Sequence, residues 1–161
     1  MPKSNSSLSN QDPFIMNEDT VNIAVVDFLK SKGFNCEPPL TGRQHGVDVK
    51  ASKGNIKVFV ESKGSQKNSA IDDEVFDHSQ IVNHIARQIH TLIKYATQYG
   101  EKNNIFVLAN PDIQRIKSEY HRIDKMVEKM QFVFMWIQQD HNVVVESPEG
   151  LEDQLYDLAL L

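Results

Sequence analysis

The stretch GVDVKASKGNIKVFVESKG, residues 46–64, decides the fold of this chain. It contains two runs in which apolar and polar side chains alternate, residues 46–52 and 55–63, separated by a lysine and a glycine. Alternation with a period of two residues is typical of β-strands, and a glycine between two such runs indicates a tight turn. The stretch therefore predicts a β-hairpin.

The turn of this hairpin sets which side chains face one another. If Lys53 and Gly54 form a two-residue turn, Asp48 on the first strand faces Phe59 on the second. Glu61 is then the diagonal neighbour of Asp48 on the same face, at roughly 7–8 Å. A one-residue bulge would turn Asp48 to the opposite face, so both arrangements stay open at the level of sequence.

The acids and the lysine of the hairpin point to one kind of chemistry. Glu61 and Lys63 are two residues apart and project to the same side of their strand, with Ser62 on the other. Carboxylates as close as those of Asp48 and Glu61 repel each other unless a cation lies between them. Mg²⁺ prefers oxygen ligands and is commonly held by one or two carboxylates, and a neighbouring lysine can position a water molecule or take its proton. These residue types indicate a site that hydrolyses phosphodiesters.

The segments around the hairpin predict an α/β protein. Helical periodicity predicts helices at residues 17–32, 79–99, 111–130 and 150–161, and apolar runs predict strands at 34–37, 104–109, 132–138 and 142–146. Asn17 is the expected N-cap of the first helix, and Gly33 is expected to end it. Residues 1–13 are polar and are expected to form a disordered tail before a single domain, residues 14–161.

Composition limits the class of protein. The chain has 161 residues, 40% of them hydrophobic, which suits one globular domain. A lone cysteine cannot form an internal disulfide, and the polar N-terminus lacks the apolar segment of a signal peptide, so we expect a cytoplasmic protein. The net charge of −5 argues against a protein that coats nucleic acid through bulk electrostatics.

Residues 16–110 resemble the PD-(D/E)XK nuclease superfamily, which has the restriction-endonuclease-like fold and includes Holliday-junction resolvases and Mrr-like restriction enzymes. The match lies in Gly46-Val47-Asp48, where valine replaces the motif's proline, and in Glu61-Ser62-Lys63. The resemblance implies a three-layer fold with a mixed central sheet and an αβββαβ core, followed here by a C-terminal α/β extension. It also implies that Asp48 and Glu61 bind metal, that Lys63 is catalytic, and that Glu18 on the first helix is a further metal ligand.

Two of these roles have simpler alternatives. Glu18 lies in the first turn of its helix, where an acid offsets the helix macrodipole without any metal. The hairpin charges Asp48, Glu61 and Lys63 would form only a solvated cross-strand cluster if that face were exposed, with ion pairs that contribute well under about 1 kcal/mol. Phe59 on the same face favours the interpretation as a site, because it suggests that the face is partly covered.

Candidate substrate-binding residues come from two regions. On the long helix, His84 and Gln88 begin a polar stripe beside the apolar one, and a glutamine on the helix after E-x-K contacts substrate in some nucleases of the superfamily. The alternative is an ordinary boundary between buried and exposed faces. Arg43, His45 and Lys50 add positive charge near the hairpin and are candidates for contacts with DNA phosphates.

Taken together, the sequence predicts an endonuclease that uses Mg²⁺, or alternatively Mn²⁺, to hydrolyse DNA, with RNA as an open alternative. The resemblance adds the expectation of a homodimer. The competing hypothesis is a catalytically inactive nuclease-fold module that binds DNA or protein as a subunit of a defence or recombination complex. The net negative charge and the acidic segment 72–77 favour that second hypothesis.

Overall fold

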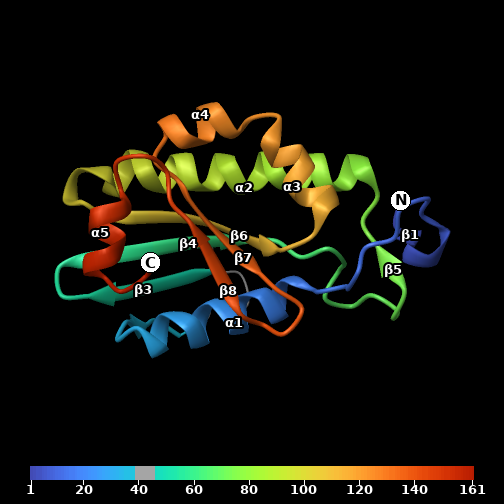
Figure 1. The fold of residues 1–161 in the computed structure, drawn as a ribbon, viewed down its shortest axis with the longest axis horizontal. Helices are drawn as coiled ribbons and strands as arrows, with labels where there is room; N and C mark the ends of the chain where they lie inside the picture. Colours follow the sequence, from blue (N-terminus) through green and yellow to red (C-terminus); the bar gives the residue numbers. More distant parts are fainter. Residues whose placement is uncertain (39–45) are drawn as a thin grey trace.

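A six-stranded mixed sheet forms the central layer of the protein (Figure 1). The computed structural model describes residues 1–38 and 46–161, and the sheet order is β2-β3-β4-β6-β7-β8. Its strands are β2 (Asn35–Cys36), β3 (Val49–Lys53), β4 (Ile56–Ser62), β6 (Ile105–Pro111), β7 (Val133–Ile137) and β8 (Val143–Glu146). The central strands β4, β6 and β7 run parallel, whereas β2, β3 and β8 pair antiparallel to their neighbours.

Helices cover both faces of the sheet, which confirms the predicted three-layer α/β architecture (Figure 1). One face packs against α1 (Glu18–Ser31) and α5 (Glu152–Asp157). The other face packs against α2 (His78–Tyr99), α3 (Gln114–His121) and α4 (Asp124–Lys129). The remaining elements are β1 (Lys3–Ser4), η1 (Asn5–Ser7), β5 (Glu74–Val75) and η2 (Gly100–Lys102). Within the described ranges, none of the helices combines the length and the apolar character required to cross a membrane.

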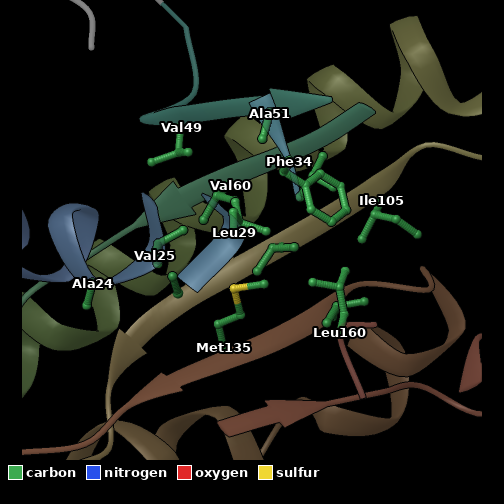
Figure 2. Packing of buried hydrophobic residues seen from close by; sticks show 14 of the residues in the cluster. Ala24, Val25, Leu29, Phe34, Val49, Ala51, Val60, Ile105, Met135 and Leu160 are labelled. Atoms are coloured by element: carbon green, nitrogen blue, oxygen red, sulfur yellow. The ribbon is translucent and has the colours of Figure 1, made fainter. Parts of the chain in front are cut away.

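Alternating side chains of β4 supply both cores. Val58 and Val60 are fully buried in the cluster on the α1 side, part of which Figure 2 shows, with Leu29 of α1 and Met135 of β7. Phe59 points the other way and stacks between Phe106 and the tyrosines of α2. Burying a side chain of this size contributes about 1.5–3 kcal/mol, so β4 holds its position through both layers.

The first helix forms as the sequence predicts. The side chain of Asn17 accepts a hydrogen bond from the backbone N–H of Thr20, which caps the helix. Gly33 follows the last turn with a φ of 87°, a left-handed conformation that glycine adopts without steric cost. Both predicted ends of α1 are therefore confirmed.

The hairpin of β3 and β4 turns one residue later than predicted. Its register pairs Lys53 with Ile56, so that Gly54 and the next residue form the turn. Gly54 has a φ of 60°, which suits the first central position of a type II′ turn. In this register Phe59 pairs with Lys50, so the predicted pairing of Asp48 with Phe59 is wrong. Asp48 lies one residue before the first paired residue, Val49, and is joined to β4 by the hydrogen bond that its carboxylate accepts from the backbone N–H of Ser62.

The strand before the turn is also shorter than predicted. It begins at Val49, and Val49 and Ala51 pack on the α1 side of the sheet. Val47 packs instead in the cluster on the α2 side, where its backbone N–H donates to the hydroxyl of Tyr95 at 3.2 Å. Strict alternation over the predicted strand, residues 46–52, would put Val47 on the same face as Val49 and Ala51, but Val47 precedes the regular strand and packs on the opposite face.

The predicted helix at residues 111–130 is divided into α3 and α4. Ile116 and Tyr120 of α3 and Val127 of α4 are all buried against the sheet, so the predicted apolar stripe is present. The chain bends at Ile123, which has φ −128° and ψ 5° and is not helical. Two short helices keep the stripe on the sheet although their axes differ in direction (Figure 1).

The first thirteen residues are tied to the rest of the chain, and the predicted disordered tail is wrong. β1 pairs with β5, and Asn5 is 8% exposed. The Asp12 carboxylate accepts two hydrogen bonds from the guanidinium of Arg115, at 2.7 and 2.6 Å. Polar composition alone did not reveal these contacts because the partners lie far away in the sequence.

Acids of the segment 72–77 bond to the N-terminal residues and cap α2. Asp73 accepts hydrogen bonds from the side chains of Ser4 and Ser6. Asp77 caps α2 by accepting a hydrogen bond from the backbone N–H of Gln80, and the Gln80 side chain accepts from the backbone N–H of Asp77. These acids therefore have structural partners within the chain.

We predict that Asp12→Asn lowers the free energy of unfolding by about 1–3 kcal/mol, because Arg115 loses its charged partner in a partly buried setting. Urea unfolding measures the loss, and limited proteolysis detects release of the N-terminal segment. The control is Asp153→Asn, a change of an exposed acid on α5. Unfolding and proteolysis that match wild type in Asp12→Asn would contradict the structural role of this ion pair.

Candidate active site

Three acids and one lysine from three elements meet at the end of β4. Glu61 is the penultimate residue of this central strand, and Lys63 follows its end. The hairpin brings Asp48 beside them, and its carboxylate accepts a hydrogen bond from the backbone N–H of Ser62 at 2.8 Å. Glu18, the first residue of α1, completes the cluster. The structure thus brings together all four residues that the sequence predicted as metal-binding or catalytic.

A close contact between two backbone segments places Glu18 at this site. The backbone N–H of Ser65 donates to the carbonyl of Met16 at 2.7 Å, and its hydroxyl accepts from the N–H of Met16 at 3.0 Å. Asn17 and Gln66 form an isolated parallel bridge beside this contact. The start of α1 is therefore fixed to the chain that directly follows Lys63.

Gly64 makes this close approach possible. A Cβ atom at this position would lie 2.5 Å from the backbone nitrogen of Glu18 and 2.8 Å from the carbonyl oxygen of Met16. Both obstacles are backbone atoms, which cannot move aside as a flexible side chain can. This role was not predicted from the sequence, although a glycine immediately after the E-x-K triplet was a signal for it.

Lys63 is the cation at the centre of the cluster. Its ammonium nitrogen lies 3.4 Å from Glu18 Oε2 and 3.7 Å from Glu61 Oε1. The side chain is 19% exposed, and Glu61 is 8% exposed, so the cluster is not a solvated patch of surface charges. Electrostatic interactions here are stronger than at an exposed position, because little water screens them.

Each of the three acids has a raised pKa. Burial and the neighbouring charge of Asp48 raise the pKa of Glu61 to about 8. The positive charge of Lys63 lowers this pKa but offsets the rise only in part. Burial also raises the pKa of Asp48, although the N–H of Ser62 and the charge of Lys63 favour its ionised form. Burial raises the pKa of Glu18 in the same way, with Lys63 opposing it. One lysine therefore does not compensate three partly buried carboxyl groups.

The chemistry of these donors fits a magnesium ion. Glu61 Oε2 is buried without a hydrogen-bond partner, and together with Asp48 and Glu18 it forms the all-oxygen set that Mg²⁺ prefers. As the side chains stand, no group of three or more histidine, cysteine or acidic residues in the described part of the chain has its donor atoms arranged for a metal ion. Lys63 is the cation that contacts Glu61 and Glu18 in this arrangement.

Gln88 lies in the core, and its predicted contact with substrate is contradicted by its complete burial. Its side-chain N–H groups donate to the carbonyls of Glu61 at 2.7 Å and Ala109 at 3.2 Å, and its oxygen accepts from the hydroxyl of Tyr120. The long helix is thereby bonded to the backbone of β4 at Glu61 itself. Gln88 supports the site from behind, which the polar stripe of the helix could not distinguish from a contact with substrate.

The other predicted substrate contacts fall into three groups. His84 lies beside the cluster, where burial and the charges of Lys63 and Arg87 lower its pKa. The ammonium of Lys50 lies over the ring of Tyr95, 5.7 Å from its centre, and contacts none of the clustered acids. The remaining two candidates, Arg43 and His45, lie outside the described residues.

We predict that Gly64→Ala destabilises the protein by about 1–3 kcal/mol, because its Cβ overpacks the backbone contact that positions Glu18. Urea unfolding measures the change. Gly100→Ala is the matched control, since a Cβ at that position meets no atom within 4 Å. Equal stability of the two variants would contradict the close approach.

The raised pKa of Glu61 gives a second prediction. In metal-free buffer the stability falls as the pH rises from 4.5 towards 8, because the folded protein retains a proton that the unfolded chain releases. The expected fall is about 2–4 kcal/mol. Glu61→Gln flattens this slope and is more stable than wild type at the upper end, whereas exposed Glu149→Gln leaves the slope unchanged. A slope in Glu61→Gln equal to that of wild type would assign the titration to another group.

No protein-family model matches the chain, and no curated protein matches it at a significant level. The functional conclusion therefore rests on the arrangement of Glu18, Asp48, Glu61 and Lys63.

Proposed function

We propose that this protein is a metal-dependent nuclease of restriction-endonuclease-like fold that hydrolyses DNA phosphodiester bonds. The observation that carries the proposal is the meeting of Asp48, Glu61 and Glu18 around Lys63 in a partly buried cluster. Two neighbouring acids and a lysine at the end of paired strands suit phosphodiester hydrolysis, because the acids can hold a divalent cation and the lysine lies within reach of the same space.

The order of elements supports the proposed fold. The chain runs α1, β2, β3, β4, α2 and β6, apart from the two-residue β5, which pairs outside the main sheet. This order agrees with the αβββαβ core of the PD-(D/E)XK superfamily. Glu61 and Ser62 of the E-x-K triplet are the last two residues of β4, and Lys63 follows them. The triplet therefore lies at the end of the third strand of that core, in agreement with the resemblance.

Each residue of the cluster has a role in the proposed reaction. Asp48, just before β3, and Glu61, near the end of β4, would bind Mg²⁺, and Glu18 would bind it from the start of α1. A bound ion would lower the pKa of a coordinated water molecule and would neutralise charge on the phosphate. Lys63 orients the attacking water by donating a hydrogen bond. Gln88 and Gly64 hold the backbone that carries these groups.

A catalytically inactive binding module is the second candidate function. Lys63 already contacts two of the acids, and the described acids do not present a metal-binding arrangement as they stand. In such a module the cluster would stabilise the junction of α1 and β4, and nucleic acid or protein would bind elsewhere on the same scaffold.

Cleavage of supercoiled plasmid and branched DNA, with and without Mg²⁺ or Mn²⁺, separates the two functions. We predict metal-dependent nicking by wild type and a loss of ~100-fold or more in Asp48→Asn, Glu61→Gln and Lys63→Met. Lys125→Gln on α4 changes an exposed lysine and is expected to cleave as wild type does.

Each outcome of this assay selects one function. Nicking that persists in all three site variants would overturn the assignment of the site. Absence of cleavage on every DNA substrate by folded wild type would favour the binding module. A parallel RNA substrate establishes whether cleavage is restricted to DNA.

A further inference from the structure

A small cavity of about 150 Å³ adjoins the catalytic cluster on the side of α2. Lys63 and Glu18 line it, and so do Lys67 and Asn68 from the chain after β4 and Arg87 from α2. Lys63 thus contacts Glu61 on one side and faces this cavity on the other. A group bound in the cavity would lie next to a phosphate held at the carboxylates.

The cavity has a positive charge that the protein as a whole lacks. Three cations line it, Lys63, Lys67 and Arg87, against a single carboxylate, that of Glu18. The Glu18 carboxylate is already paired with Lys63 at 3.4 Å. Lys67 and Arg87 are exposed, and neither forms an ion pair with any residue that the structure describes. In a chain with a net charge of −5, two such cations facing one hollow favour an anionic ligand.

A neutral donor and the size of the cavity limit the kinds of ligand that it can bind. The oxygen of the Asn68 side chain accepts from the backbone N–H of Asp19, which leaves its NH₂ group as a donor for the cavity. A volume of about 150 Å³ corresponds to roughly five water molecules and is below the usual range for sites that enclose a whole organic ligand. This space accommodates a phosphate group, whereas a sugar or base would remain outside.

We propose that this cavity is a phosphate subsite, in which Lys67, Arg87 and Asn68 bind a phosphate of nucleic acid next to the one held at the carboxylate cluster. This inference rests on the proposed nuclease function for the identity of its ligand. The phosphate is either an internal phosphodiester of a strand that passes through the site or the terminal monoester of a strand that ends there. Both present the same anionic oxygens to the guanidinium and ammonium groups.

Binding of labelled DNA in EDTA, followed by fluorescence anisotropy over a range of salt concentrations, tests the subsite without cleavage. The probes are one duplex with 5′-phosphate ends, the same duplex with 5′-hydroxyl ends, and a closed dumbbell duplex without ends. We expect Lys67→Gln/Arg87→Gln to weaken binding and to reduce the slope of log K against log salt by about 1 per lost contact.

A charge-matched control separates local from general electrostatics. Lys125→Gln/Lys129→Gln removes two exposed lysines of α4. Its affinity and salt slope are expected to lie closer to those of wild type than the values of Lys67→Gln/Arg87→Gln do. Because Lys67 and Arg87 are exposed, thermal unfolding of their variant should equal that of wild type. A weakened affinity for the dumbbell supports an internal phosphate, and a loss confined to the 5′-phosphorylated duplex supports a terminal one.

Unchanged affinity and salt slope on all three probes, or a loss no greater than in the control variant, would overturn the subsite. That result is distinguishable from failure of the proposed function, which appears as absence of cleavage by wild type in the presence of metal. If wild type cleaves DNA and the Lys67→Gln/Arg87→Gln variant binds DNA as wild type does, the proposed nuclease function stands and the proposed phosphate subsite is wrong.

Discussion

The backbone contact between Met16–Asn17 and Ser65–Gln66 is the constraint on which the candidate site depends. It joins the start of α1 to the chain that leaves β4, and it places Glu18 within 3.4 Å of Lys63. Only a residue without a Cβ fits at Gly64 in this contact. The end of β4 and the start of α1 are thereby held in the relative position that gathers all three acids. From the other face of the sheet, Gln88 fixes α2 to the carbonyl of Glu61.

The electrostatics of the molecule follow from this arrangement. Burial raises the pKa of each of the three carboxyl groups around Lys63, and at Glu61, whose pKa rises to about 8, the charges of Asp48 and Glu18 add to the effect. The carboxylates of such a cluster repel one another when they are ionised, and a divalent cation would relieve this repulsion. Other acids that contribute to the net charge of −5 have structural partners, as Asp12 has in Arg115. A negative total charge is therefore compatible with a local cavity lined by Lys67 and Arg87.

Local patterns in the sequence predict much of the fold, and together with the family resemblance they predict the four residues of the cluster. The caps of α1 follow from Asn17 and Gly33, and alternation along β4 gives the correct faces even though the turn is displaced by one residue. What the sequence could not show depends on contacts between distant segments. The burial of Gln88 and the attachment of the N-terminal segment are of this kind. The division of the helix after Pro111 is a related case, because the apolar period continues through the break.

We propose that Asp48, Glu61 and Glu18 bind a divalent cation in place of protons. Calorimetric titration of the folded protein with Mg²⁺ or Mn²⁺ in buffers of different ionisation enthalpy measures metal binding and proton release together. Because the pKa of Glu61 is about 8, binding near neutral pH should release about one proton per site in wild type, and Glu61→Gln should lose this release. Absence of metal binding, or binding that releases no proton in wild type, would contradict the account.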